Sequence, residues 1–151
     1  MKIEFVVPGQ PKGKGTHRTV KGHAYADPAT RAYERTVGTC ARIAMGPARP
    51  LEGPVSLQID AVATPPESWS KKRRQRAASG FEYPTVKPDL SNVIKAVEDG
   101  CKGITWLDDK QVVELTSGKR YGYQACVFVQ ITTMADQAPE AKAVIEKAIA
   151  A

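Results

Sequence analysis

Residues 87–100 read Lys87-Pro88-Asp89-Leu90-Ser91-Asn92-Val93-Ile94-Lys95-Ala96-Val97-Glu98-Asp99-Gly100, and this stretch predicts the central helix of the fold. Pro88 disfavours helical backbone at the residue before it. Asp89 is of a type preferred at helix N-caps, where its side chain can accept a hydrogen bond from a free backbone N–H, so the helix is predicted to begin there. Gly100 and Gly103 are candidate ends. The apolar stripe at helical spacing consists of Leu90, Val93, Ile94, Val97 and Cys101.

A second acidic segment, Trp106-Leu107-Asp108-Asp109-Lys110, follows the predicted helix after a short loop. We expect this loop to return Asp108 and Asp109 to the neighbourhood of Asp89. Carboxylates that lie close together repel one another unless a cation lies between them. Mg²⁺ prefers oxygen ligands, typically one or two carboxylates together with waters and substrate phosphates. The two acidic segments therefore favour metal-dependent phosphodiester chemistry.

These motifs resemble the RusA family of phage and prophage Holliday junction resolvases. The central resemblance lies in the pattern Lys-Pro-Asp-Leu-x-Asn-x-x-Lys-Ala-x-x-Asp, followed by Trp-Leu-Asp-Asp-x-Gln-Val. Residues 7–15, Val-Pro-Gly-Gln-Pro-Lys-Gly-Lys-Gly, are similar to the family's basic glycine-proline loop, and residues 24–34 to the tyrosine-containing start of its first helix. With gaps, the resemblance covers roughly residues 3 to 133.

The resemblance implies a crossover junction endodeoxyribonuclease of DNA recombination and repair, which cuts branched DNA such as four-way (Holliday) junctions symmetrically. It implies Mg²⁺ as the cofactor, with Mn²⁺ as an alternative. Asp89, Lys95 and Asp109 then correspond to catalytic residues, and the metal ligands fall on Asp89, Ser91, Asp108 and Asp109. Because a four-way junction has two-fold symmetry and needs two symmetric cuts, a homodimer is expected.

Ser91 departs from the family pattern, which has a second aspartate two residues after the first. A hydroxyl can ligate Mg²⁺ or hold a ligand water, but it brings no negative charge, so metal affinity should fall. Three alternatives follow: a weaker but working site, compensation by Asp108 or Glu98, or a protein that binds branched DNA without cutting it. A basic interaction protein for an acidic partner is a further alternative from another functional class.

Lys95 has two interpretations. As a catalytic residue it stabilises the extra negative charge of the phosphorus transition state, while Asp89 and Asp109 hold the metal that activates water. Alternatively, Lys95 pairs with Asp99, four residues further along the helix, in an ordinary exposed ion pair. Asp99 itself is interpreted as structural.

The distribution of charge favours a nucleic-acid partner. The net charge is +6, and residues 65–87 carry six Lys or Arg against two Glu, whereas residues 89–114 carry six acids against three Lys. A basic rim around an acidic centre would hold phosphates around a metal, although a solvated basic surface is the alternative. The predicted DNA contacts are Lys12, Lys14, Arg18, Lys71, Lys72, Arg73, Arg74, Arg76 and Lys87. We expect His17 and His23 to contact phosphate or to be simply exposed.

Other features narrow the class of protein. The P-loop spacing is absent, so no nucleotide cofactor is expected. The apolar run at residues 3–7 is too short and too acidic for a signal peptide, and no stretch approaches membrane-spanning length, so no membrane partner and a cytoplasmic location are expected. The three cysteines, Cys40, Cys101 and Cys126, are predicted to be buried reduced thiols.

The remaining segments predict a two-layer α+β fold. Strands are predicted at residues 2–7, 55–63, 112–117 and 125–132, with the last two forming a hairpin through residues 118–122. Residues 10–22 are predicted to form a basic loop, and a helix is predicted to begin at Asp27-Pro28 and to continue through about Met45. A short basic helix is predicted after a cap at Ser68 or Ser70. Residues 77–83 are predicted to form a flexible connection. The order β-α-β-(α)-α-β-β-α places helices on a mixed or mainly antiparallel sheet of about four strands. Residues 1–133 are predicted to form a RusA-like nuclease domain and residues 134–151 a C-terminal helix or tail.

Overall fold

The computed structural model describes residues 1–15, 18–25, 27–134 and 147–150. Its elements follow one another as β1 (Lys2–Pro8), β2 (Arg18–Val20), β3 (His23–Tyr25), α1 (Pro28–Met45), β4 (Val55–Ala63), α2 (Lys71–Arg76), a π-helical turn (Ala77–Phe81), α3 (Leu90–Cys101), a 3₁₀ turn (Asp109–Gln111), β5 (Val112–Tyr121) and β6 (Cys126–Thr133). The predicted α+β class, with helices and a four-stranded mixed sheet, is confirmed.

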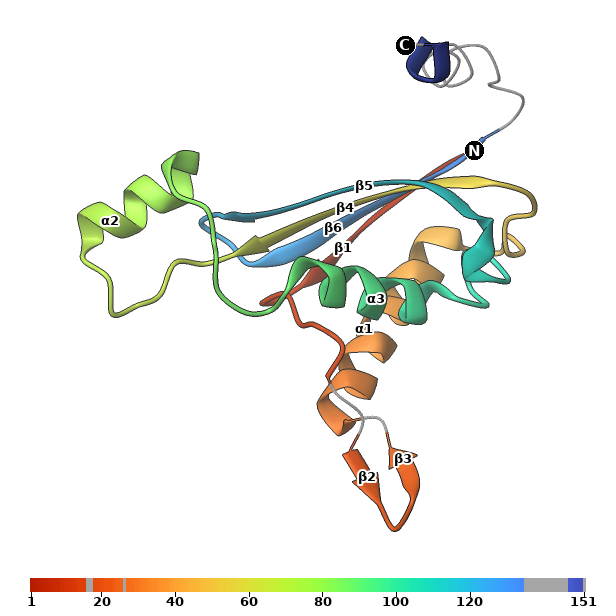
Figure 1. The fold of residues 1–151 in the computed structure, drawn as a ribbon, viewed down its shortest axis with the longest axis horizontal. Coiled ribbons are helices and arrows are strands. Elements are labelled where there is room, and N and C mark those ends of the chain that lie inside the picture. Colours follow the sequence, from red (N-terminus) through yellow and green to blue (C-terminus); the bar gives the residue numbers. More distant parts are fainter. Residues whose placement is uncertain (16–17, 26, 135–146, 151) are drawn as a thin grey trace.

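The sheet has the strand order β1-β6-β4-β5 (Figure 1). Strand β6 pairs antiparallel with β1 and with β4, whereas β4 and β5 are parallel. The predicted hairpin of the last two strands is therefore wrong, because β4 lies between β5 and β6. Parallel neighbours require a long crossover, and the segment between β4 and β5 that makes this crossover contains α2 and α3.

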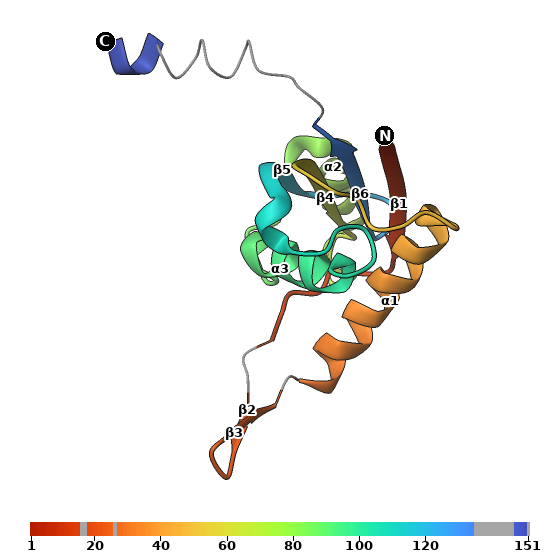
Figure 2. The same ribbon diagram turned by 90° about the vertical axis from the view of Figure 1, so that its right-hand side faces the viewer.

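Helices α1 and α3 lie on the same face of the sheet (Figures 1 and 2). Side chains alternate along the strands, so that Leu57 and Ile59 of β4 and Val129 of β6 are fully buried against the helices. Trp106, in the loop after α3, is also fully buried. Burial of this apolar surface is the main stabilising contribution to the fold, and it fixes α3 against the sheet.

The predicted helix starts are confirmed. The carboxylate of Asp27 accepts a hydrogen bond from the Thr30 backbone N–H at 3.3 Å, Pro28 is the first residue of α1, and the helix ends at Met45. Ser70 caps α2, and α3 follows Asp89 in the N-cap position. Two details of α3 differ from the prediction: Asp89 makes no side-chain capping hydrogen bond, and the helix continues through Gly100 to Cys101.

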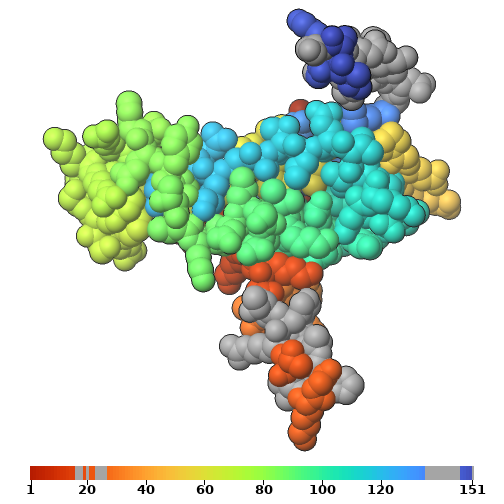
Figure 3. All heavy atoms as spheres, in the orientation of Figure 1, coloured from red at the N-terminus to blue at the C-terminus, as the bar shows by residue number. Residues whose placement is uncertain are grey.

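Two connections are more ordered than predicted. The basic loop at residues 10–22 includes strand β2, which pairs with β3 as a two-stranded ribbon. Residues 77–81, predicted to be flexible, form the π-helical turn after α2. Figure 3 shows that α2 with this turn projects from one end of the body, and Figure 1 shows that the β2–β3 ribbon projects from its side.

The three cysteines do not share one environment. All three cysteines are free thiols; Cys101 is buried, whereas Cys40 and Cys126 are only half-buried. Residues 147–150 form a helical turn, and the rest of the predicted helix or tail from residue 135 onward lies outside the described residues. Within the described part of the chain, no helix has the length and apolar character needed to cross a membrane.

Candidate active site

A groove of about 700 Å³ opens at the N-terminal end of α3, and we call it the N-terminal groove. Asp89 lines it together with three of the predicted DNA contacts, Lys12, Lys14 and Lys87. The first turn of α1 forms the opposite wall. The structure therefore brings the first predicted catalytic aspartate to a surface that has a surplus of basic side chains.

The basic glycine loop is held on α3 by its backbone. The N–H of Lys14 donates a hydrogen bond to the carbonyl of Asn92 at 2.9 Å. A Cβ atom at Gly13 would lie 2.9 Å from the Cβ of Asn92, so a larger residue would push the loop away from the helix. From the other side, the ammonium of Lys119 in β5 donates to the carbonyls of Val86 at 2.7 Å and Pro88 at 3.0 Å. The chain on each side of the groove is thus positioned by specific contacts.

Asp89 and Ser91 are both exposed at this end of α3. The backbone of Asp89 has the extended conformation of an N-cap, with φ −65° and ψ 139°, but its side chain makes no capping hydrogen bond. Among the described residues, none forms a hydrogen bond or ion pair with the Asp89 carboxylate. This carboxylate is therefore available to a ligand from solution.

Lys95 lies at the centre of a second group, which we call the Lys95 network: Lys14, Lys95, Glu98, Asp99 and Asp109. The Lys95 ammonium lies 3.1 Å from Asp109 Oδ2 and 3.2 Å from Asp99 Oδ1. It also lies 3.8 Å from Glu98 Oε2. The ammonium of Lys14 contacts the other oxygen of Asp99 at 2.5 Å. The helix pairing predicted as the alternative for Lys95 is present, and Asp109 joins it from the acidic turn.

Asp109 is fixed by two donors that come from different elements. The indole N–H of the buried Trp106 donates to Oδ1 at 3.1 Å, and Lys95 donates to Oδ2 at 3.1 Å. Partial burial alone would raise the pKa of Asp109, but these two hydrogen bonds outweigh it and hold the pKa below its ordinary value. Asp109 is therefore ionised in the folded protein at neutral pH.

The same network also shifts the pKa values of Lys95 and Glu98. Burial would lower the pKa of Lys95, yet hydrogen bonds to Asp109 and Asp99 raise it overall. Burial is the main cause that raises the pKa of Glu98; the charge of Lys95 lowers this pKa, the charges of Asp109 and Asp99 raise it, and the net shift is upward. Lys95 is thus held charged, while the charged form of Glu98 is disfavoured.

Asp108 has a local structural contact. Its Oδ1 accepts a hydrogen bond from the Lys110 backbone N–H at 3.2 Å and caps the 3₁₀ turn. Gln111 completes the turn, because its amide oxygen accepts from the Leu107 and Asp108 N–H groups and its amide nitrogen donates to the Leu51 carbonyl at 2.8 Å. These bonds fix the position of Asp109 next to α3.

The predicted metal ligands suit Mg²⁺ in chemistry, since they offer carboxylate and hydroxyl oxygens. Their arrangement differs from the expected convergence: the described residues contain no group of three or more Asp, Glu, His or Cys side chains that could hold a metal ion. Mg²⁺ often takes only one or two protein carboxylates and keeps several waters. Asp89, whose carboxylate has no partner in the described part of the chain, fits that role, whereas Asp109 already accepts hydrogen bonds from Lys95 and Trp106.

The predicted DNA contacts on α2 are mostly free at the surface. Lys71, Lys72, Arg74 and Arg76 are exposed. Arg73 is engaged internally, because its guanidinium lies 3.5 Å over the Trp69 ring and pairs with Glu82 at 2.6 Å. The side chain of Arg18 and residue His17 lie outside the described part of the chain, as does the side chain of His23.

Sequence reasoning missed several positioning residues. Lys119 was assigned to a turn, and no local pattern indicates that it holds the start of α3 from the neighbouring strand. Trp106 and Gln111 were recognised only as part of a motif, although the indole N–H and the side-chain amide make the contacts that orient Asp109. The spacing of four residues predicts the contact of Asp99 with Lys95, but its contact with Lys14 joins residues far apart in the sequence and has no local signal.

Comparison with known proteins agrees with this arrangement. The sequence profile of the family described as endodeoxyribonuclease RusA matches residues 8–132, which include β2, α1, α3 and the acidic turn. The chain is also 33% identical over 135 residues to the "Uncharacterized protein YqaN" of Bacillus subtilis (strain 168), covering 85% of this chain and 94% of that protein. Nucleases of the RusA family generally depend on a divalent metal and act on branched DNA junctions. The chain therefore belongs to the RusA endodeoxyribonuclease family.

Proposed function

We propose that this protein is a Mg²⁺-dependent, structure-selective endodeoxyribonuclease that resolves four-way DNA junctions by symmetric cuts as a homodimer. The observation that carries the proposal is the contact between Lys95 and Asp109. These residues are 14 positions apart, and their side chains meet at 3.1 Å. They are the lysine and the last aspartate of the pattern that the family resemblance marks as catalytic.

The residues have distinct proposed roles. Asp89 binds the divalent metal at the exposed end of α3, with Ser91 holding a ligand water beside it. When bound, the metal supplies an activated water and offsets charge on the leaving oxygen. Lys95 stabilises negative charge on the transferring phosphate. Asp109 keeps Lys95 charged and oriented, and Asp108 supports this position by holding the turn.

The basic side chains around this site are proposed to bind the DNA backbone. Lys12, Lys14 and Lys87 line the N-terminal groove beside Asp89, so phosphates of the cleaved strand are expected there. The exposed cations of α2 extend from the end of the body and are proposed to contact a separate part of the junction. Arg73 would support this surface by holding α2 against Trp69 and Glu82.

The test is nicking of a synthetic four-way junction by the full chain in Mg²⁺, with EDTA and a linear duplex of matched sequence as controls. We expect paired nicks near the crossover, only in the presence of metal and only on the junction. Absence of nicking in Mg²⁺ or Mn²⁺ would contradict nuclease activity, and equal cutting of the linear duplex would contradict structure selectivity.

A second candidate function is a branched-DNA-binding protein that does not cut. Two observations favour it: Ser91 replaces a carboxylate, and the Lys95 ammonium is already surrounded by Glu98, Asp99 and Asp109. This alternative predicts that the protein retards the junction in EDTA but leaves it intact in any metal. Ser91→Asp is run in parallel: if the wild type shows no metal-dependent nicking and Ser91→Asp restores it, the natural chain is a binder that does not cut.

A further inference from the structure

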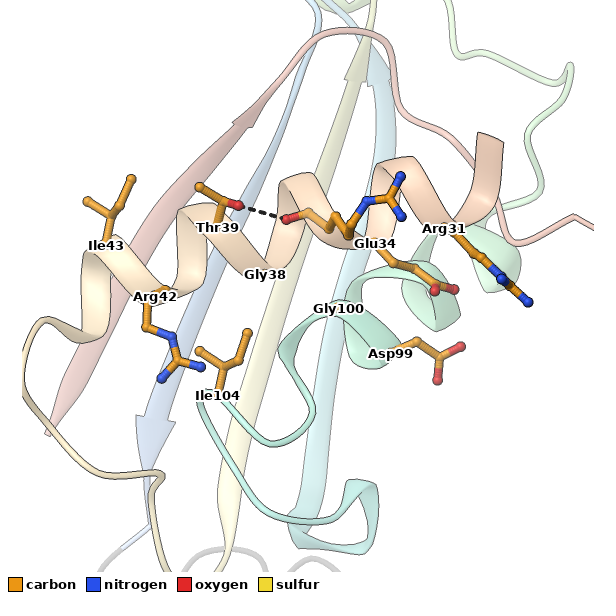
Figure 4. A pocket seen from close by; sticks show the side chains of 10 residues that line it. Arg31, Glu34, Gly38, Thr39, Arg42, Ile43, Asp99, Gly100 and Ile104 are labelled. Carbon is orange, nitrogen blue, oxygen red and sulfur yellow. Dashed lines mark hydrogen bonds between the residues drawn. The ribbon is translucent and has the colours of Figure 1, made fainter. Parts of the chain in front are cut away.

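One face of α1 carries arginines to which the proposed nuclease function assigns no role. Arg31, Arg35 and Arg42 line a hollow of about 690 Å³ between α1 and the C-terminal end of α3 (Figure 4). At 3.6 residues per turn, their spacings of four and seven residues place them within about 40° of one another around the helix axis. They therefore form a straight stripe, about 16 Å long at 1.5 Å per residue.

The floor of the hollow is formed where the two helices cross closely. A Cβ atom at Gly100 would lie 2.7 Å from the Cβ of Val37, and one at Gly38 would lie 3.1 Å from the carbonyl oxygen of Gly100. Figure 4 shows Gly38 and Gly100 between Arg31 at one end of the hollow and Arg42 at the other. Because both positions at the crossing lack a side chain, the two helices approach closely there, and the arginines line the hollow beside the crossing.

The positive charge of this stripe is largely uncompensated. Within the described residues, the guanidinium groups of Arg31, Arg35 and Arg42 form no hydrogen bond or ion pair. Two acids line the hollow, Glu34 and Asp99. Asp99 is already neutralised by Lys14 and Lys95, so it does not cancel the arginines. An anionic ligand would meet at least two unbalanced positive charges here.

The hollow adjoins the candidate active site. Thr30 lines the N-terminal groove, and Arg31, the next residue, lines the hollow. Lys14 lines the N-terminal groove and pairs with Asp99, which lines the hollow. A linear polyanion that lies in the groove can therefore continue along α1, where three arginines outnumber the two acids of the hollow, Glu34 and Asp99. DNA has this shape and charge, with one phosphate per 3.4 Å of each strand, so the stripe matches about five phosphates.

We propose that Arg31, Arg35 and Arg42 bind the sugar-phosphate backbone of one duplex arm of a DNA junction, as a backbone contact separate from the basic groove and from α2. This proposal rests on the proposed function, because it takes junction DNA as the ligand. The arginines lie beyond the residues that would touch the reacting phosphate, so they contribute to binding and to the positioning of the arm. The contact is independent of sequence, since backbone phosphates carry no base information.

The test measures binding of the full chain to a long-armed four-way junction as a function of salt, in EDTA so that no cutting occurs. The triple variant Arg31→Ala/Arg35→Ala/Arg42→Ala is compared with the wild type and with a variant that loses three charges elsewhere, Lys2→Ala/Arg49→Ala/Lys147→Ala. Each lost phosphate contact lowers the slope of log K against log salt by about 0.9. We expect a slope smaller by about 2 to 3 in the α1 variant and by less than about 1 in the control.

Two further measurements separate charge from structure and from catalysis. The triple replacement of the same arginines by lysine keeps the charge, and we expect it to retain most of the slope. In Mg²⁺, we expect the α1 alanine variant to need more protein for half-maximal nicking while its rate at saturating protein stays within about twofold of the wild type.

The outcomes distinguish this proposal from the proposed function. Junction nicking by the wild type together with an unchanged salt slope in the α1 alanine variant would overturn the α1 contact alone. An equal loss of slope in the control variant would also overturn it, because the effect would then follow net charge. Absence of junction binding by the wild type would overturn both proposals.

Discussion

At the N-terminal end of α3, Asp89 is exposed and its carboxylate has no partner among the described residues, whereas Asp109, packed beside the middle of the same helix, accepts hydrogen bonds from Trp106 and Lys95. Among the described residues, only the backbone positions Asp89, whereas two hydrogen bonds to the side chain fix Asp109. We therefore propose different roles for them: Asp89 binds an external cation, and Asp109 maintains the charge and orientation of Lys95.

The first prediction concerns Asp89, where the effect on activity should be largest and the effect on stability smallest. Asp89→Asn removes the charge that the metal requires, and we expect junction nicking to slow by about 10²- to 10³-fold, equivalent to about 3 to 4 kcal/mol. Because the carboxylate makes no contact within the described fold, the melting temperature should be unchanged. Single-turnover nicking and thermal unfolding measure the two effects. Glu114→Gln, on exposed β5, is the matched control, and an equal rate loss there would contradict the assignment.

Substitution of Asp109 should reduce both nicking activity and stability. Asp109→Ala leaves the Trp106 indole N–H without its acceptor and removes one of the carboxylates that Lys95 contacts. We expect it to destabilise the fold by about 1 to 3 kcal/mol, besides slowing nicking. Urea unfolding of this variant beside Asp89→Ala checks the comparison directly. If Asp89→Ala destabilised the protein as much as Asp109→Ala, the two carboxylates would not differ in how they are held.

A substitution at Ser91, at the exposed N-terminal end of α3, should strengthen metal binding. Ser91→Asp adds a carboxylate two residues after Asp89, and we expect the Mg²⁺ concentration for half-maximal nicking to fall by about tenfold. The first turn of α3 contains no acidic residue, so the new charge should also stabilise the helix by about 0.3 to 1 kcal/mol through the helix dipole. Ser91→Asn is the neutral control. An unchanged Mg²⁺ dependence in Ser91→Asp would show that position 91 does not contribute to metal binding.

The smallest effects concern pH, and they have opposite signs at two carboxylates of the Lys95 network. The pKa of Asp109 is lowered from 3.8, so its stabilising contribution is present above that value and is lost as pH falls through the folded pKa. The pKa of Glu98 is raised from 4.5, so its contribution is present below that value and is lost as pH rises through the folded pKa.

We therefore expect Glu98→Gln to increase stability at pH 7 by at most about 1 kcal/mol, with the gain vanishing in acid. Asp109→Asn should decrease stability at pH 7, and that loss should shrink as the pH falls below about 4. Urea unfolding curves at pH 7 and at pH 3 to 5 measure both. Effects of the same sign at pH 7 would contradict the opposite pKa shifts.

Local signals predicted most helices and strands well because their physical causes are local. Asp27-Pro28 and Ser70 begin helices through side-chain capping and a fixed proline φ, and the alternating pattern of residues 55–63 identifies a half-buried strand. Strand pairing was not predictable in the same way. Gly118 was interpreted as a turn residue, yet it lies within β5, where a Cβ would come within 3.0 Å of Arg120 as that side chain pairs with Asp60. The glycine provides space there and does not turn the chain.

The candidate site was predictable only in part for the same reason. The sequence alone places Asp89 and Lys95 on one helix, and the structure confirms that placement. It does not indicate that Asp109 would contact Lys95 while the Asp89 carboxylate would have no partner among the described residues. This depends on how Trp106 and Gln111 fold the acidic turn against the body. The Lys14–Asp99 and Lys119–Pro88 contacts likewise join residues far apart in sequence.

The account is tested most directly by locating the bound cation in a crystal of the protein with a four-way junction, using anomalous scattering from Mn²⁺. We expect a Mn²⁺ peak within ligand distance of the Asp89 carboxylate and of a DNA phosphate, with Lys95 close to the same phosphate. A Mn²⁺ ion bound elsewhere with Asp89 facing solvent, or a junction complex with no Mn²⁺ at α3, would contradict it.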